Sequence, residues 1–270
     1  MDTILILIAT LLVTGVAAGF MAGLLGVGGA FLLVPVQFRL LHTLLGLDAT
    51  LALRVAFATS LAVVLPTALS GAIAHHRHGV IHWAAAIRMG AAGIPGGVAG
   101  ALIATHAGSS LLGPLFAALL VIAAARMLVP LSAGRPLTRI CGTPLLLAIG
   151  GCTGILSGMF GIGGGIVLVP ALILLCGCPT HRAVGTSTAF ILLTSIGGLA
   201  VFLSSSPPAG VLPFFAAGYI DLLQWLVLAV TTIPMAQAGA WAAHRTDAGI
   251  LRKIFAAMLV LGALDILSVA

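Results

Sequence analysis

Glycine clusters interrupt two apolar stretches of the chain, and both follow the pattern Gly-x-Gly-Gly. Glycine destabilises a helix interior by about 1 kcal/mol relative to alanine, so a cluster predicts a helix break. A break exposes the first backbone N–H groups of the next helix, which carry partial positive charge and can bind an anion. The sequence therefore predicts substrate-binding breaks at Gly26, Gly28 and Gly29 and at Gly161, Gly163, Gly164 and Gly165.

Hydroxyl side chains recur after both clusters, as the pairs Thr59-Ser60 and Thr186-Ser187. Serine and threonine in membrane helices often bond to their own backbone, which is one interpretation of these pairs. Their recurrence at matching places in the two halves favours the other interpretation, in which the four hydroxyls face the substrate.

Two further polar residues, Arg39 and Gln237, are candidates for substrate contact. An arginine at membrane depth is costly, so Arg39 either contacts an anion or extends to the membrane surface. Gln237 follows Pro234 by three residues within an apolar segment, and we expect it to line a pocket.

Composition shows what must position these residues. Hydrophobic residues make up 61% of the 270 positions and charged residues only 6%, against about 25% charged in soluble domains. A water-facing surface cannot be covered by so small a number of charges. We therefore expect the chain to be an all-α integral membrane protein. The net charge of +6 comes from isolated basic residues between apolar runs, which argues against nucleic acid as a partner.

The chain contains two copies of one unit. The stretch GFMAGLLGVGGAFLLVP, residues 19–35, aligns without gaps with GILSGMFGIGGGIVLVP, residues 154–170, and eight of the 17 positions are identical. Glycines at a spacing of four accompany each stretch, at Gly15/Gly19/Gly23 and Gly150/Gly154/Gly158, and predict close helix packing. We divide the chain into a first transmembrane repeat (1–130), a cytoplasmic connection (131–142) and a second transmembrane repeat (143–270).

Each repeat contains five apolar segments. An odd number of segments makes the second repeat enter the membrane from the opposite side, so inverted repeats are expected. The second segment of each repeat contains a proline and is expected to be a partial helix or one arm of a re-entrant hairpin. The expected segments are 3–24, 29–47, 51–74, 81–104 and 109–130, then 143–160, 164–178, 183–204, 220–243 and 249–269.

The distribution of basic residues tests this topology. With ten segments, eight basic residues fall on one face and two, Arg39 and Arg54, on the other, while Arg88 falls within a segment. Cytoplasmic loops carry the excess of Lys and Arg, so the 131–142 connection is expected in the cytoplasm and both termini outside. An eight-span alternative divides the basic residues almost evenly and explains nothing.

The duplicated motifs GLLGVGGAFLLVP and GMFGIGGGIVLVP, each followed by a Thr-Ser pair, resemble the sulfite and organosulfonate exporter family, TauE/SafE. The resemblance covers essentially the whole chain. It implies a multi-pass carrier of the cell inner membrane that exports small sulfur-containing anions such as sulfite. Two departures are Ala30, where the second copy and the family pattern have glycine, and Arg39, whose partner is the apolar Leu174.

Two other functions, a metal permease and an intramembrane enzyme, have less support in the sequence. A transition-metal permease would rest on His75-His76-Arg77-His78 and His82, but a solvated loop explains them more simply. An intramembrane enzyme would rest on Ser157-Gly158, which lacks the preceding glycine of a nucleophile motif. No Walker motif is present, which argues against ATP as the driving force. The four cysteines contain no CxxC, so core packing is their simplest role.

The expected partners are therefore the lipid bilayer and a small sulfur anion. We expect no cofactor, no metal and no catalytic residue. A proton or a sodium ion is the expected coupling ion, and a homodimer is compatible with this reading.

Overall fold

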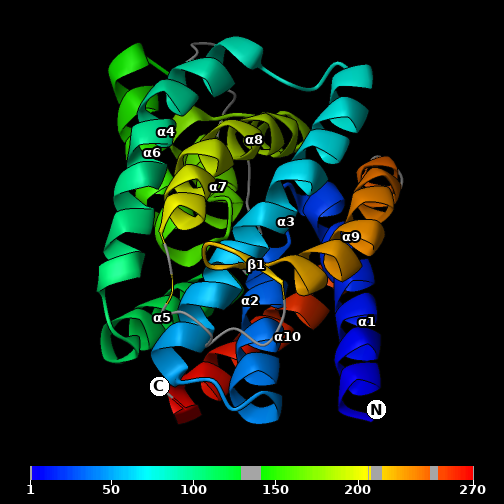
Figure 1. Ribbon diagram of the computed structural model, residues 1–270. Helices are drawn as coiled ribbons and strands as arrows, with labels where there is room; N and C mark the ends of the chain where they lie inside the picture. Colours follow the sequence, from blue (N-terminus) through cyan, green and yellow to red (C-terminus); the bar gives the residue numbers. More distant parts are fainter. Residues whose placement is uncertain (1, 129–140, 206, 208–214, 244–248, 270) are drawn as a thin grey trace.

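The computed structural model describes residues 2–128, 141–205, 207, 215–243 and 249–269. Within these residues the protein is almost entirely helical, with one short two-stranded antiparallel ladder (Figure 1). The helices of the first repeat are α1 (Asp2–Leu25), α2 (Ala30–Arg39) with a π-helical turn (Leu40–Leu44), α3 (Ala49–Arg77), α4 (Trp83–His106) and α5 (Ser109–Leu128). The second repeat has α6 (Thr143–Phe160), α7 (Gly165–Cys176), α8 (Thr180–Ser204), β1 (Ala216–Ala217), β2 (Ile220–Asp221), α9 (Leu222–Ala242) and α10 (Gly249–Val269).

The prediction of an all-α membrane protein is confirmed. Seven helices in the described part of the chain are long and apolar enough to cross a membrane. The second helix of each repeat is shorter, as predicted: α7 has 12 residues and α2 with its π-turn covers Ala30–Leu44. At 1.5 Å per residue, α7 is about 18 Å long, which is less than the roughly 30 Å hydrocarbon layer.

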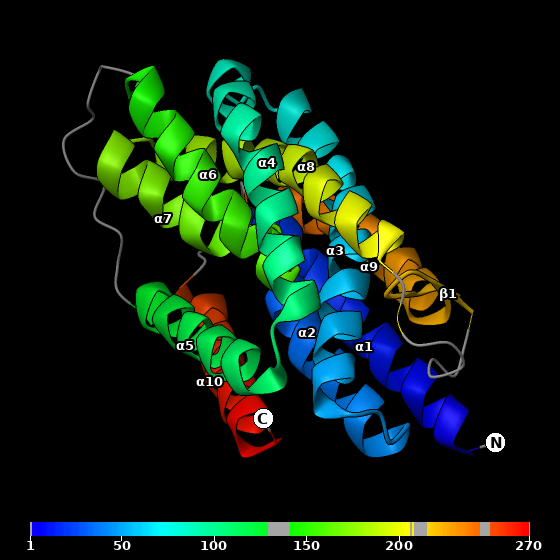
Figure 2. The same cartoon turned by 60° about the vertical axis from the view of Figure 1, so that its left-hand side comes forward.

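The first helix of each repeat packs against the fourth helix of the other repeat. Helix α1 packs on α9, and its repeat equivalent α6 packs on α4. The third helices, α3 and α8, pack on each other at the centre and are the most buried of the long helices. The last helices, α5 and α10, lie side by side on one flank (Figure 2). This exchange is the pattern expected of two copies related by a two-fold axis, and it supports the inverted arrangement, which stays a prediction.

Small residues at the helix contacts allow this packing. A Cβ built on Gly154 of α6 would collide with the backbone of Gly93 on α4. On the equivalent pair, a Cβ on Gly19 of α1 would lie 2.6 Å from the backbone of Thr232 on α9. The packing role predicted for these glycines is therefore confirmed.

The histidine-rich segment is only partly the solvated loop expected from the sequence: residues 76–79 are exposed, but its first residues belong to a helix. Helix α3 continues to Arg77, and the side chain of His75 is buried, with its Nε2 donating to the carbonyl oxygen of Gly23 at 3.0 Å. The expectation was wrong for this part because a run of polar residues can extend a helix when one face still packs against a neighbour. A disulfide between Cys141 and Cys176 was also not predicted.

Residues 131–140 of the predicted connection lie outside the described residues. The orientation of the protein in the membrane can instead be tested at two exposed turns, which lie at opposite ends of the molecule. Figure 1 shows both chain ends at the lower end of the molecule and the α3–α4 connection at the upper end. His78 lies exposed in that connection, and Ser110 lies exposed at the start of α5.

In a cysteine-free background, we expect Ser110→Cys to react with a membrane-impermeant maleimide on intact cells, because the positive-inside topology places this turn outside. His78→Cys should react only after the cells are opened. Labelling of both positions from the same side of the membrane would contradict the ten-segment topology.

Candidate functional site

The two glycine clusters break the helices where the sequence predicted. Helix α1 ends at Leu25 and α2 begins at Ala30, while α6 ends at Phe160 and α7 begins at Gly165. The φ angles of the intervening glycines are positive, between 65° and 85°, a region that other residues rarely adopt. The N-cap residues of α2 and α7 are Gly29 and Gly164, and neither offers a side chain to the helix N-terminus.

The structure brings the two breaks into contact with each other. A Cβ on Gly165 would lie 2.5 Å from both the carbonyl oxygen of Gly26 and the Cα of Val27. A Cβ on Gly28 would lie 3.0 Å from the carbonyl oxygen of Ile162. Every residue in the ranges 21–35 and 157–166 is buried, so the breaks meet in the interior of the protein.

The threonines of the Thr-Ser pairs link the two repeats. The backbone N–H of Asp221 donates to Oγ1 of Thr59, and the backbone N–H of His82 donates to Oγ1 of Thr186, both at 3.0 Å. Asp221 and His82 occupy equivalent positions in the two repeats and are the N-cap residues of α9 and α4. Each threonine therefore holds the start of a helix that belongs to the other repeat. A hydroxyl that accepts one hydrogen bond can still donate its proton, so both threonines remain available to an anion.

Of the serines of the same pairs, Ser187 contacts the first break and Ser60 contacts α2. Ser187 Oγ donates to the carbonyl oxygen of Gly26 at 2.9 Å, so it lies directly against the first break. Ser60 Oγ donates to Oε1 of Gln37, on α2, at 2.8 Å. A hydroxyl has one proton, so each serine would have to exchange its present partner to donate to a substrate.

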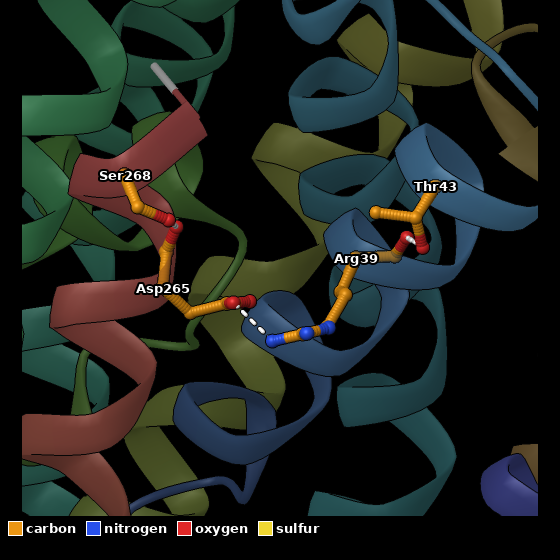
Figure 3. A network of polar contacts seen from close by, with 4 residues as sticks. All are labelled: Arg39, Thr43, Asp265 and Ser268. Atoms are coloured by element: carbon orange, nitrogen blue, oxygen red, sulfur yellow. Dashed lines mark hydrogen bonds and ion pairs between the residues drawn. The ribbon is translucent and has the colours of Figure 1, made fainter.

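Two predicted site residues, Arg39 and Gln237, lie apart from this cluster. Arg39 lies at the end of α2, about 15 Å along the helix from Gly29. Its side chain is 64% exposed and pairs with Asp265 of α10 (Figure 3). Gln237 is exposed on α9. Neither side chain is brought to the glycine breaks.

Three buried polar residues were not predicted as site residues, and of these Ser157 lies beside a break. The side chains of Gln37 and Ser157 are fully buried, and in the described part of the protein Nε2 of Gln37 and Oγ of Ser157 have no hydrogen-bond partner. Asp221 is also buried, and burial raises the pKa of its carboxyl group against the opposing effect of hydrogen bonds from Gln224. Comparison of the two repeats could have pointed to two of these residues. Ser157 aligns with the apolar Ala22, and Gln37 aligns with the apolar Leu172.

Comparison with known proteins identifies the family. The family model described as sulfite exporter TauE/SafE matches residues 11–266. The chain belongs to the TauE/SafE family. A protein of Haemophilus influenzae named as a probable membrane transporter is 30% identical over 94% of this chain and 96% of its own length. Another of the same description, from Methanocaldococcus jannaschii, is 30% identical over 87% of this chain and 86% of its own length.

A third relative of this TauE/SafE chain, the probable membrane transporter YunE of Bacillus subtilis, is 28% identical over 90% of the chain and 88% of its own length. No solved structure matches. Together with the seven membrane-length helices, these likenesses show that the chain is a multi-pass membrane protein of a transporter family.

The threonine links give a testable energetic expectation. Valine has the shape of threonine without the hydroxyl, so Thr59→Val leaves the buried N–H of Asp221 without its acceptor. An unsatisfied buried donor costs about 1–3 kcal/mol. We expect Thr59→Val and Thr186→Val each to lower the thermal unfolding temperature of the purified protein.

The matched controls are Thr59→Ser and Thr186→Ser, which retain the hydroxyl and lose one methyl group. They should be clearly more stable than the valine variants. If serine and valine destabilised the protein equally, the hydrogen bonds across the repeats would not be what holds these helices.

Proposed function

We propose that this TauE/SafE protein is a secondary transporter that exports small sulfur-containing anions such as sulfite or organosulfonates. The anion binds between the two glycine breaks, which come one from each repeat. The contact between the breaks is the observation that carries the proposal, since it brings two uncapped helix N-termini into one buried region. The description of the matching family model supports the choice of substrate.

The chemistry of the breaks suits an anion. Residues 21–35 and 157–166 contain no charged side chain, so the attraction comes from backbone N–H groups at the starts of α2 and α7. An unpaired donor in an apolar interior costs several kcal/mol, and an anion relieves this cost. Neutral donors also hold an anion less tightly than a desolvated arginine would, and a carrier must release its cargo.

The arrangement of the repeats suggests how transport proceeds. We assign the two repeats opposite orientations in the membrane, as the exchanged packing of α1 with α9 and α6 with α4 supports. Movement of one repeat against the other then exposes the buried breaks to one face at a time. The coupling proton or sodium ion and the homodimer stay predictions from the sequence.

No specific observation favours the metal permease. The histidines that suggested it have separate tasks: Nε2 of His75 donates to a backbone carbonyl, and Nδ1 of His76 accepts from Nε1 of Trp83. Nδ1 of His82 accepts from the backbone N–H of Ala85 and caps α4.

Flux into proteoliposomes tests the proposal. We expect saturable movement of labelled sulfite, inhibited by excess sulfoacetate, and no movement of zinc. The assay is run at alkaline pH, where membrane-permeant sulfur dioxide is scarce, with protein-free liposomes as the control. Zinc flux without sulfite flux would replace the proposal with the metal permease.

A further inference from the structure

Ser157 carries a buried hydroxyl for which the described part of the protein provides no hydrogen-bond partner. Its side chain is 0% exposed on α6, and its Oγ makes no hydrogen bond within the described residues. A buried hydroxyl without a partner costs free energy, and serines in helices commonly relieve that cost by bonding to the backbone one turn earlier. The first repeat avoids the problem, because Ala22 occupies the equivalent position.

The side chain of Ser157 lies beside the start of α7. The Cβ of Ser157 is 3.4 Å from the position that a Cβ on Gly164 would take, and Gly164 is the N-cap of α7. The carbonyl of Gly164 accepts from the N–H groups of Val167 and Leu168, which closes the first helical turn. The N–H groups of the two preceding residues have no acceptor within the helix. Donors of two kinds, one hydroxyl and the backbone N–H groups, therefore meet at one buried place.

The start of α2 presents the same kind of backbone N–H groups, but the side chains around the first break differ. At its N-cap, a Cβ on Gly29 would lie 3.3 Å from the methyl group of Ala22, which offers no donor. The carbonyl oxygen of Gly26 in the same break already accepts the hydrogen bond from Ser187. The two breaks are similar in backbone shape but unequal in the hydrogen-bond donors that they present.

We propose that the N-terminus of α7 together with the hydroxyl of Ser157 forms the principal anion-binding half of the site, and that the break before α2 serves mainly as its wall. This inference rests on the proposed function. The ligand is an oxyanion of sulfur, sulfite or a sulfonate, whose oxygens accept from the hydroxyl and the backbone N–H groups together. All of these groups are buried, so the ligand reaches them only when the repeats move apart.

Exchange of the two aligned residues tests the inference. Ser157→Ala makes the second break resemble the first, and Ala22→Ser is the matched control at the equivalent position. Binding of labelled sulfite to the purified full-length protein is measured for both variants and the wild type. We expect Ser157→Ala to weaken binding about 10-fold or more, because a hydrogen bond to a charged group is lost. Ala22→Ser should change the affinity less than about 2-fold.

Thermal unfolding without ligand separates a binding role from a structural one. Removal of an unpaired buried hydroxyl should leave the unfolding temperature of Ser157→Ala unchanged or raise it. A lowered unfolding temperature with unchanged affinity would assign Ser157 to packing and overturn the inference. Equal weakening in both variants would also overturn it, because the breaks would then contribute equally. If the wild type bound neither sulfite nor sulfoacetate, the proposed function would fail and this inference with it.

Discussion

The hydrogen bonding of the backbone inside a membrane is the constraint on which this structure depends. Lipid offers no hydrogen bonds, so an interrupted helix is tolerated only where protein covers the interruption. Here each of the two interruptions is covered by the other: Gly28 lies against the backbone of Ile162, and Gly165 lies against Gly26 and Val27. Each break packs partly against the opposite repeat. The helix breaks therefore depend on the duplication, because each copy supplies protein surface that covers the break of the other copy.

The same dependence extends to the long helices. Helices α4 and α9 each begin at an N-cap residue whose backbone N–H donates to a threonine of the opposite repeat. The side chains of these caps, His82 and Asp221, close the first turns of their own helices. The position of each helix start is thus coupled to the two central helices, α3 and α8. Such links would transmit a shift of one repeat to the other, which is what a carrier requires.

Much of this architecture follows from local patterns in the sequence. Apolar runs located the ten α-helices of the described residues, because membrane helices need length and hydrophobicity. Glycine clusters located the breaks, because glycine weakens helices. The partners of polar groups were beyond such reasoning. Thr59 and Asp221 are 162 residues apart, and only the folded arrangement shows that one holds the other. Arg39 attracted attention as an unusual charge at apparent membrane depth, yet its partner Asp265 is 226 residues away. The sequence suggested Ser157 only as a candidate nucleophile, because the burial of its hydroxyl becomes apparent only in the folded protein.

Binding of the anion by backbone N–H groups at the glycine breaks can be tested by diffraction at the selenium absorption edge. Crystals are soaked in selenite, a heavier analogue of sulfite. We expect an anomalous peak within hydrogen-bond distance of the backbone nitrogens at the start of α7, between the two breaks. A peak beside Arg39 or Arg88, with none between the breaks, would contradict this binding mode and place the anion on an arginine.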